Sequence, residues 1–285
     1  MDRRMSETIR LAAGAVSIQV GAVTDVGLRR RLNEDAILVL PAVYIVADGM
    51  GGYEAGDQAS RAVVEAFREI AEGRDALTPE QVTAALELAD ERVAEVAAGT
   101  RRGAGSTVAG AVLVEDGGAP HWLVFNVGDS RVYRQAGSAL EQLTVDHSLG
   151  QQLYQAGRIT AEELAVFKDR NVITRAIGAA DAEADAYLMP VRNGERLLVC
   201  SDGLSSELPD ELIRATMAAG GAPGVLATAL VELAKRNGGR DNISVLVIDV
   251  AAGGADFDVA AATVGGHLED YLDESTAPVT GGSDA

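Results

Sequence analysis

The sequence predicts an α+β fold built as a layered sandwich, because its strands and helices come in separate groups. Segments rich in β-branched and apolar residues lie within 17–48, 107–134 and 196–250. Blocks with helical periodicity lie at 59–96 and 209–236. Strands followed by paired helices, twice along the chain, are typical of an α+β sandwich. A doubly wound nucleotide-binding fold would alternate more regularly.

Eight segments have the composition of strands: 17–23, 36–40, 43–48, 107–114, 121–127, 131–134, 196–202 and 242–250. In the first helical block, Ala59, Val63, Phe67 and Ile70 share one face. A capping box beginning at Thr78 predicts the start of the next helix. Later helices are expected at 209–217 and 224–236. Residues 146–178 are polar and partly helical, which is typical of a flap beside a site.

We expect one folded domain over residues 16–251. A polar lead at 1–15 and an acidic tail at 252–285 are both expected to be mobile. Within the tail, residues 267–274 could form a short helix. The lead contains arginines but no continuous apolar stretch, so it does not resemble a signal peptide, and no apolar run is long enough to span a membrane.

The composition favours a soluble, cytoplasmic protein. Apolar residues make up 47% of the chain and the net charge is -19, which disfavours nucleic acid and membranes as partners. Most of this acidic surplus is explained by solubility alone. The single cysteine, Cys200, excludes an intrachain disulfide and fits a reducing compartment. Because it lies in an apolar strand, we expect it in the core and not as a nucleophile.

Acidic residues recur at the ends of predicted strands, beside small residues. One Asp-Gly pair is usually only a turn, but this repetition suggests that several carboxylates converge at one edge. Converging carboxylates cannot all stay ionised without cations, because like charges raise one another's pKa. The acids concerned are Glu34, Asp35, Asp48, Asp129, Asp202 and Asp241.

An all-oxygen ligand set favours Mg²⁺ or Mn²⁺ over Zn²⁺. The glycines after Asp48 leave room for waters and let a carbonyl such as that of Gly49 act as a ligand. Two such ions can activate a water and hold a phosphoryl group. An arginine among Arg29, Arg30 and Arg31 could bind the phosphate. The alternative for each arginine is a solvated basic turn.

Seven motifs in order closely resemble the metal-dependent serine/threonine protein phosphatases of type 2C. They are DVGLRRRLNED, VADGMGG, GAGSTVAG, FNVGDSR, TRAIG, CSDGL and GGRDNISV, spread over residues 25–249. The resemblance implies a four-layer α-β-β-α sandwich with two central, mostly antiparallel sheets flanked by helix pairs. It also implies hydrolysis of phosphoserine and phosphothreonine by direct attack of a water that bridges two metal ions.

The resemblance also implies a role for each matching residue. Asp48 would bridge two Mn²⁺ or Mg²⁺ ions, and Asp35 would orient the water. Arg30 matches the phosphate-binding arginine, whereas Arg29 and Arg31 do not. Asp129, with Asp202, matches a third, weaker metal site in bacterial members. The implied metal ligands are Glu34, Asp48, Gly49, Asp129, Asp202 and Asp241.

One position departs from the animal members, where a histidine follows the Asp-Gly pair. Here it is Met50, as in many bacterial members, and methionine cannot donate a proton. A metal-bound water is the preferred general acid. His147 is the other candidate, although a structural role suits it better.

Several alternatives stay open. A non-catalytic sensor of metal or phosphopeptide is one, and hydrolysis of small phosphate esters is another. The expected partners are phosphorylated proteins and an opposing serine/threonine kinase, with the chain acting as a monomer.

Overall fold

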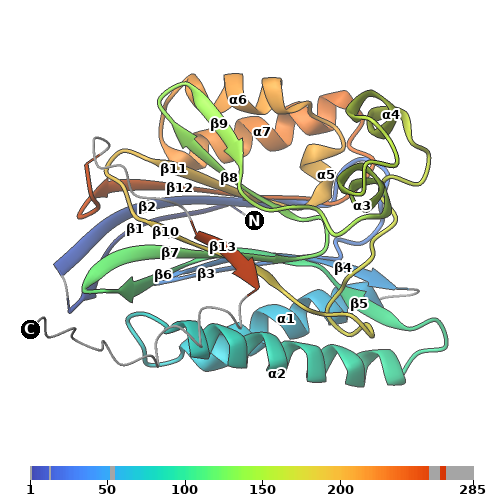
Figure 1. Ribbon diagram of the computed structural model, residues 1–285, viewed down its shortest axis with the longest axis horizontal. Coiled ribbons are helices and arrows are strands. Elements are labelled where there is room, and N and C mark those ends of the chain that lie inside the picture. The colour runs from blue at the N-terminus through green and yellow to red at the C-terminus, as the bar shows by residue number, and fades with distance from the viewer. Residues whose placement is uncertain (1, 13, 52–54, 257–263, 268–285) are drawn as a thin grey trace, which may run out of the picture.

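The structure is a computed structural model that describes residues 2–12, 14–51, 55–256 and 264–267. Two sheets stack face to face, with one pair of helices above and another below (Figure 1). In the upper sheet the strand order is β1 (Asp2–Leu11), β2 (Gly14–Asp25), β12 (Ile243–Ala252), β11 (Arg196–Cys200), β8 (Arg131–Ala136) and β9 (Ala139–Gln142).

In the lower sheet the order is β13 (Val264–His267), β10 (Asp185–Pro190), β7 (Ala119–Val127), β6 (Val108–Asp116), β4 (Val43–Gly51) and β3 (Asp35–Leu40). The short β5 (Ala104–Ser106) pairs with the end of β4. The strand neighbours in both sheets run antiparallel.

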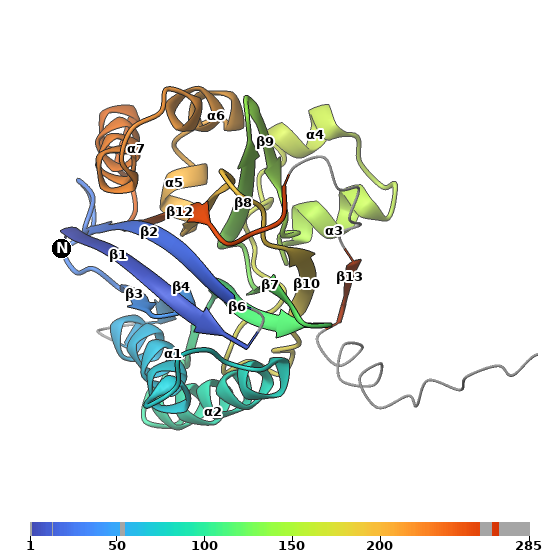
Figure 2. The same ribbon diagram turned by 90° about the vertical axis from the view of Figure 1, so that its left-hand side faces the viewer.

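The outer layers are α1 (Ala55–Ala71) with α2 (Pro79–Ala98) below, and α6 (Asp210–Ala218) with α7 (Pro223–Asn237) above. Figure 2 shows the four layers end on. Between β9 and β10 lie α3 (Leu149–Gln155) and α4 (Ala161–Val166), at the side of the sandwich, and α5 (Asp202–Ser205) follows β11. The predicted α+β four-layer sandwich is confirmed.

Three apolar cores hold the layers together. Between the sheets, Tyr44 packs edge-on against Trp122 with ring centroids 6.0 Å apart. Between the lower sheet and α1, Phe67 stacks on Phe125 at 5.5 Å. A third core, mostly of aliphatic side chains, joins the upper sheet to α6 and α7. Because β4 and β6 are covered on both faces, they are apolar over most of their length instead of alternating between apolar and polar residues.

Helix α2 begins as the sequence predicts. The Thr78 hydroxyl accepts a hydrogen bond from the Gln81 N–H, the Gln81 side chain accepts one from the Thr78 N–H, and Pro79 is in the first turn. Helix α7 packs directly on β2, and Gly21 allows this close approach. A Cβ at that position would come within 2.1 Å of the Gly224 nitrogen. No helix in the described residues is long and apolar enough to cross a membrane.

The expectation of a mobile lead at residues 1–15 is wrong for most of that segment. Residues Asp2–Leu11 form β1, which pairs with β2. Ile9 is buried and joins the core between the sheets, while alternate side chains such as Thr8 and Arg10 face solvent. Most of the tail predicted at 252–285 lies outside the described residues, as does the helix proposed at 267–274 except for His267, which ends β13.

Candidate active site

Two carboxylates of the lower sheet lie opposite each other at one end of the sandwich. Asp35 begins β3 and pairs in register with Asp48 near the end of β4. The Asp48 backbone is fixed by Thr107, whose hydroxyl accepts from the Asp48 N–H at 3.2 Å and whose N–H donates to the Asp48 carbonyl at 2.8 Å. The apolar strand therefore delivers Asp48 to a defined position.

The upper sheet contributes its acids at the same end. Asp202 follows β11, whose last residue, Cys200, pairs with Arg131 at the start of β8. Asp129 lies just before that start, and Asp241 lies just before β12. The strand ends of both sheets thus bring together acids that are far apart in the sequence.

These side chains line one pocket of about 220 Å³. Asp35 is the exception: it is buried, does not belong to the lining, and accepts a hydrogen bond from the Ser201 hydroxyl at 2.8 Å. The other predicted site residues line the pocket itself. The lining consists of Arg30, Glu34, Asp48, Gly49, Met50, Gly51, Asp129, Asn171, Ile173, Asp202, Asp241 and Asn242.

Burial and mutual repulsion raise the pKa values of these acids. Burial is the main cause for Asp48 and Asp129, and neighbouring carboxylates add to it, so both pKa values lie well above the ordinary 3.8. Burial and Asp241 raise the pKa of Asp202 to about 6. Burial raises the pKa of Asp35 to about 7 although serine hydroxyls oppose the shift.

The donor set suits a divalent cation. Among the described residues no three acidic, histidine or cysteine side chains are already spaced as ligands of one ion, and Arg30 pairs with the Asp241 carboxylate. However, one oxygen of Asp35 is buried without a partner, and carboxylates from both sheets share the pocket. Hard oxygen ligands with excess negative charge fit Mn²⁺ or Mg²⁺.

Glycine allows the first helix to approach the site. A Cβ on Gly49 would come within 1.9 Å of the Gly56 carbonyl oxygen, at the beginning of α1, and the Gly49 N–H donates to the Glu34 carbonyl at 3.1 Å. A Cβ on Gly56 would lie 2.5 Å from Glu34 Oε1. The Glu34 carboxylate therefore rests beside two bare backbone segments.

Arg30 provides the cation in the pocket. Its Nη2 lies 2.7 Å from Asp241 Oδ2, and about half of its side chain is exposed. This exposure and the position in the lining allow it to reach a bound anion.

Asn242 is a positioning residue that the sequence analysis did not identify. Its Oδ1 accepts from the Glu34 N–H at 2.8 Å. Its Nδ2 donates to the carbonyls of Val26 and Leu32 at 3.0 and 2.9 Å. Since Asn242 is buried and directly follows Asp241, it ties the Arg30 loop to two acids of the pocket. The sequence feature that could have indicated this role is the position of Asn242 between an acidic residue, Asp241, and the strand that begins at Ile243.

Comparison with known proteins agrees with this geometry. A family model described as protein phosphatase 2C matches residues 29–232. The chain belongs to the protein phosphatase 2C family. It is 32% identical over 277 residues to the serine/threonine protein phosphatase PstP of Mycobacterium tuberculosis, covering 95% of this chain and 52% of PstP. The chain thus spans about half the length of that relative. It is also 32% identical over 239 residues to the serine/threonine phosphatase stp of Listeria monocytogenes, and the match covers 79% of this chain and 93% of that protein.

Solved structures of the family share the architecture. The crystal structure of M. tuberculosis PstP aligns with a TM-score of 0.75 at 32% identity, covering 83% of this chain and 100% of that one. The PstP catalytic domain in complex with two manganese ions aligns with a TM-score of 0.74 at 31% identity, covering 83% and 99%.

Three residues singled out in the sequence can be placed within this phosphatase 2C fold. Met50 lines the pocket. His147 is buried, with Nδ1 accepting from the Gly128 N–H at 3.2 Å and Nε2 3.3 Å from Asp185, and it is not part of the lining. Cys200 is fully buried, which raises its pKa to about 12. The burial of His147 and Cys200 therefore suits structural roles for these two residues.

The flap residues form a second cavity of about 240 Å³ that shares Asp129, Asn171 and Asp202 with the pocket of this phosphatase 2C chain. Arg131 in its wall is neutralised by Asp146, with two contacts of 2.8 and 2.7 Å. The predicted flap at 146–178 thus lies beside the site.

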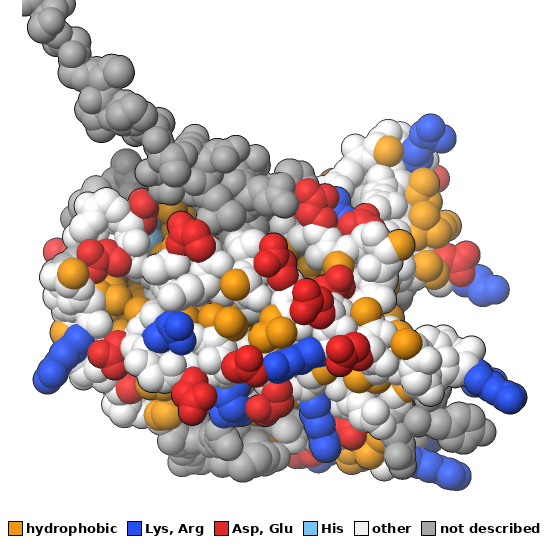
Figure 3. Space-filling model, turned by 90° about the horizontal axis from the view of Figure 1, so that it is seen from below, with side chains coloured by type: hydrophobic (Ala, Val, Ile, Leu, Met, Phe, Trp, Pro, Cys, Tyr) orange, Lys and Arg blue, Asp and Glu red, His pale blue; other side chains and the backbone are white. Residues whose placement is uncertain are grey.

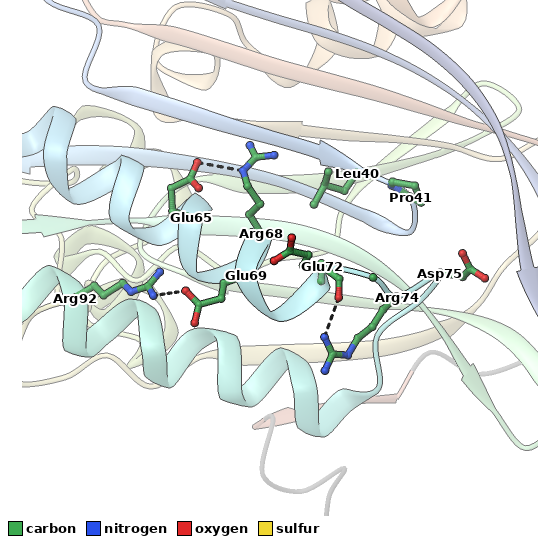
Figure 4. Close-up of a pocket in the computed structure, with 11 residues that line it drawn as sticks. Leu40, Pro41, Glu65, Arg68, Glu69, Glu72, Arg74, Asp75 and Arg92 are labelled. Atoms are coloured by element: carbon green, nitrogen blue, oxygen red, sulfur yellow. Dashed lines mark hydrogen bonds and ion pairs between the residues drawn. The ribbon is translucent and has the colours of Figure 1, made fainter.

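A larger cavity of about 680 Å³ lies at the other end of α1. Figure 4 shows two ion pairs among its charged groups: Arg68 with Glu65 at 3.1 Å, and Arg92 with Glu69 at 2.5 Å. Acidic and basic side chains are interspersed over the surrounding face (Figure 3). The described lining of this cavity mixes four acids with three arginines, whereas five acids and one arginine line the pocket at the strand ends.

Proposed function

We propose that this chain is a metal-dependent protein phosphatase that hydrolyses phosphoserine and phosphothreonine. The observation that carries the proposal is a single pocket lined by acids from both sheets together with one guanidinium. Carboxylates alone would repel a phosphate dianion. Divalent cations reverse the sign of the pocket, so that it attracts the phosphoryl group.

We assign the metal ligands from the pocket and the family. Glu34, Asp48 and the Gly49 carbonyl would hold one ion, and Asp48, Asp202 and Asp241 the second. Asp129, with Asp202, would hold a third more weakly. When bound, Mn²⁺ or Mg²⁺ ions would activate water as the nucleophile and neutralise charge on the phosphoryl oxygens.

The chain's own residues would position the reactants. Arg30 would donate two hydrogen bonds to the phosphoryl oxygens, because its guanidinium is half exposed at the pocket. Asp35 would accept a hydrogen bond from the attacking water and fix its direction, using the oxygen that has no partner. Met50 would contact the substrate without transferring a proton.

We further propose that the substrates are phosphoproteins of a cytoplasmic serine/threonine kinase system and that the chain works as a monomer. The names of the relatives, as serine/threonine phosphatases, support the substrate class. The single buried cysteine suits a reducing compartment. Size-exclusion chromatography with light scattering would test the monomeric state.

The deciding experiment is phosphate release from a phosphothreonine peptide with Mn²⁺, with a chelator, and with Asp48→Asn. Release that requires Mn²⁺ and is lost in the variant is the expected result. Binding of Mn²⁺ and of phosphopeptide without any release would instead identify a sensor. Release only from small phosphate esters would remove proteins as substrates.

A further inference from the structure

The loop between β2 and β3 carries three consecutive arginines, and the middle one lines the pocket. Arg30 lines the pocket and pairs with Asp241. Arg29 and Arg31 are exposed, and within the described residues their guanidinium groups have no hydrogen bond or ion pair. We call residues 28–32 the arginine tip.

The arginine tip is held firmly at its base. Asn242 binds the carbonyls of Val26 and Leu32, on either side of the arginines, and the Leu28 N–H donates to the Gly239 carbonyl at 2.7 Å. Consecutive Cα atoms are about 3.8 Å apart. The outer arginines therefore start from fixed points within one side-chain length of Arg30.

The charge of the tip differs from that of the whole molecule, which has a net charge of -19. Neighbouring guanidinium groups without acidic partners repel one another and favour a bound anion. A peptide that places its phosphoresidue in the pocket must lay the adjacent residues across the rim. Carboxylate side chains at these positions fit the paired donors of arginine.

We propose that Arg29 and Arg31 bind acidic side chains flanking the phosphoresidue, so that acidic phosphopeptides are the preferred substrates. The proposal rests on the proposed function. The exposed side chains of Leu28 and Leu32 give the tip an apolar border against which the aliphatic part of a glutamate can pack. Arg30 binds the phosphate itself, and Arg29 and Arg31 bind the side chains of the residues that flank the phosphoresidue.

The test compares phosphothreonine peptides whose flanking residues are glutamate, alanine or lysine, with acidic residues on the N-terminal or the C-terminal side. Hydrolysis gives kcat/KM, and non-hydrolysable phosphonate versions give binding affinity. The variant is Arg29→Ala/Arg31→Ala. The control is Arg10→Ala/Arg74→Ala, which removes the same charge from exposed positions outside the tip. Because Arg74 also donates to the Ile70 and Glu72 carbonyls, the melting temperature of this control is measured beside its kinetics. A small aryl phosphate reports on the pocket alone.

Each exposed ion pair contributes little, so we expect the double variant to lose roughly four- to twenty-fold in kcat/KM on the acidic peptide. The loss should appear in KM, shrink at high salt, and be absent for the alanine peptide, the aryl phosphate and the control variant. Charge reversal, Arg29→Glu/Arg31→Glu, should turn the preference toward lysine-flanked peptides.

Equal losses on acidic and alanine peptides, or no loss, would overturn the proposal. If no substrate were hydrolysed but the phosphonate peptides kept the same charge preference, the catalytic function would fail while the recognition by the tip would stand. The two failures are therefore distinguishable.

Discussion

Arg30 and Asp241 meet at 2.7 Å across 211 residues of sequence. The contact joins the loop after β2 to the turn before β12, and the Asp241 carboxylate raises the pKa of the Arg30 guanidinium further. Asp241 is also a proposed metal ligand. Arg30 and a metal ion would thus share one carboxylate, which would place the phosphate-binding cation beside the ions.

Replacing Arg30 with alanine should raise KM for phosphopeptides and lower kcat/KM roughly 10- to 100-fold, because hydrogen bonds to charged groups contribute about 1.5–3 kcal/mol. Steady-state kinetics at saturating Mn²⁺ measure the effect. The conservative variant Arg30→Lys should recover part of it. Unchanged inhibition by inorganic phosphate in the alanine variant would contradict a phosphate-binding role.

Asp48→Asn should lower kcat for metal-dependent hydrolysis by roughly 10³-fold, because the proposed bridging ligand loses its charge. In the presence of a chelator the same variant should be more stable than the parent. Burial and neighbouring acids raise the folded-state pKa of Asp48, so its ionisation costs stability as pH rises above about 3.9, the unfolded value. The gain in melting temperature should therefore be larger at pH 8 than at pH 4. A smaller gain at pH 8 would disprove this repulsion.

Binding of Mn²⁺ should release protons between pH 6 and 7. The metal-free pKa values of Asp202 and Asp35 are raised to about 6 and about 7, so part of the site is protonated near neutrality and a cation must displace those protons. Calorimetry in buffers of different ionisation enthalpy counts them. Apparent affinity should rise with pH in this window. Titration without proton release would show that the acids are already ionised.

Asn242→Ala should lower both stability and activity. The change removes three side-chain hydrogen bonds and leaves three partly buried backbone groups without these partners, at a cost of about 2–4 kcal/mol. Because the Arg30 loop loses its anchor, KM should rise even at temperatures where the variant is fully folded. Denaturation curves and kinetics on the same preparation separate the effects. A stability loss with normal KM would limit Asn242 to a structural role.

Thr78→Ala should cost about 1 kcal/mol of stability, because the α2 capping box loses its hydroxyl. Since α2 lies on the outer face of the lower sheet, kcat and KM should not change. Chemical denaturation measures the loss. The variant also serves as a control for mildly destabilised proteins in the other experiments.

The sequence predicted well those features that depend on local pattern. The capping box at Thr78 and the apolar runs of β4 and β12 each determine an element from their own residues. Asp48 was recognisable because an acid that ends a buried strand and precedes glycines has a distinctive setting. The proposed roles of the site residues rest on the family resemblance together with, for all but Asp35, their position in one pocket.

What escaped prediction depends on distant partners. In strand β1, polar side chains face solvent and alternate with side chains that face the core, such as Ile9. This short alternation was not recognised as a strand from the sequence. Strands β10 and β13 are short, and they are held by strand edges that come from other parts of the chain. The anchoring by Asn242 links residues more than 200 positions apart, and no local pattern specifies such a contact.

The place of β12 between β2 and β11 has a consequence for synthesis. Asp241 and Asn242 stand just before β12, whereas β2 leaves the ribosome more than 200 residues earlier. Closing such a long loop is slow, because chain entropy opposes contacts between distant segments. The proposed metal ligands can therefore come together only after β12 has emerged and inserted. Until then a partly synthesised chain would lack the complete pocket, and the proposed hydrolysis could not begin.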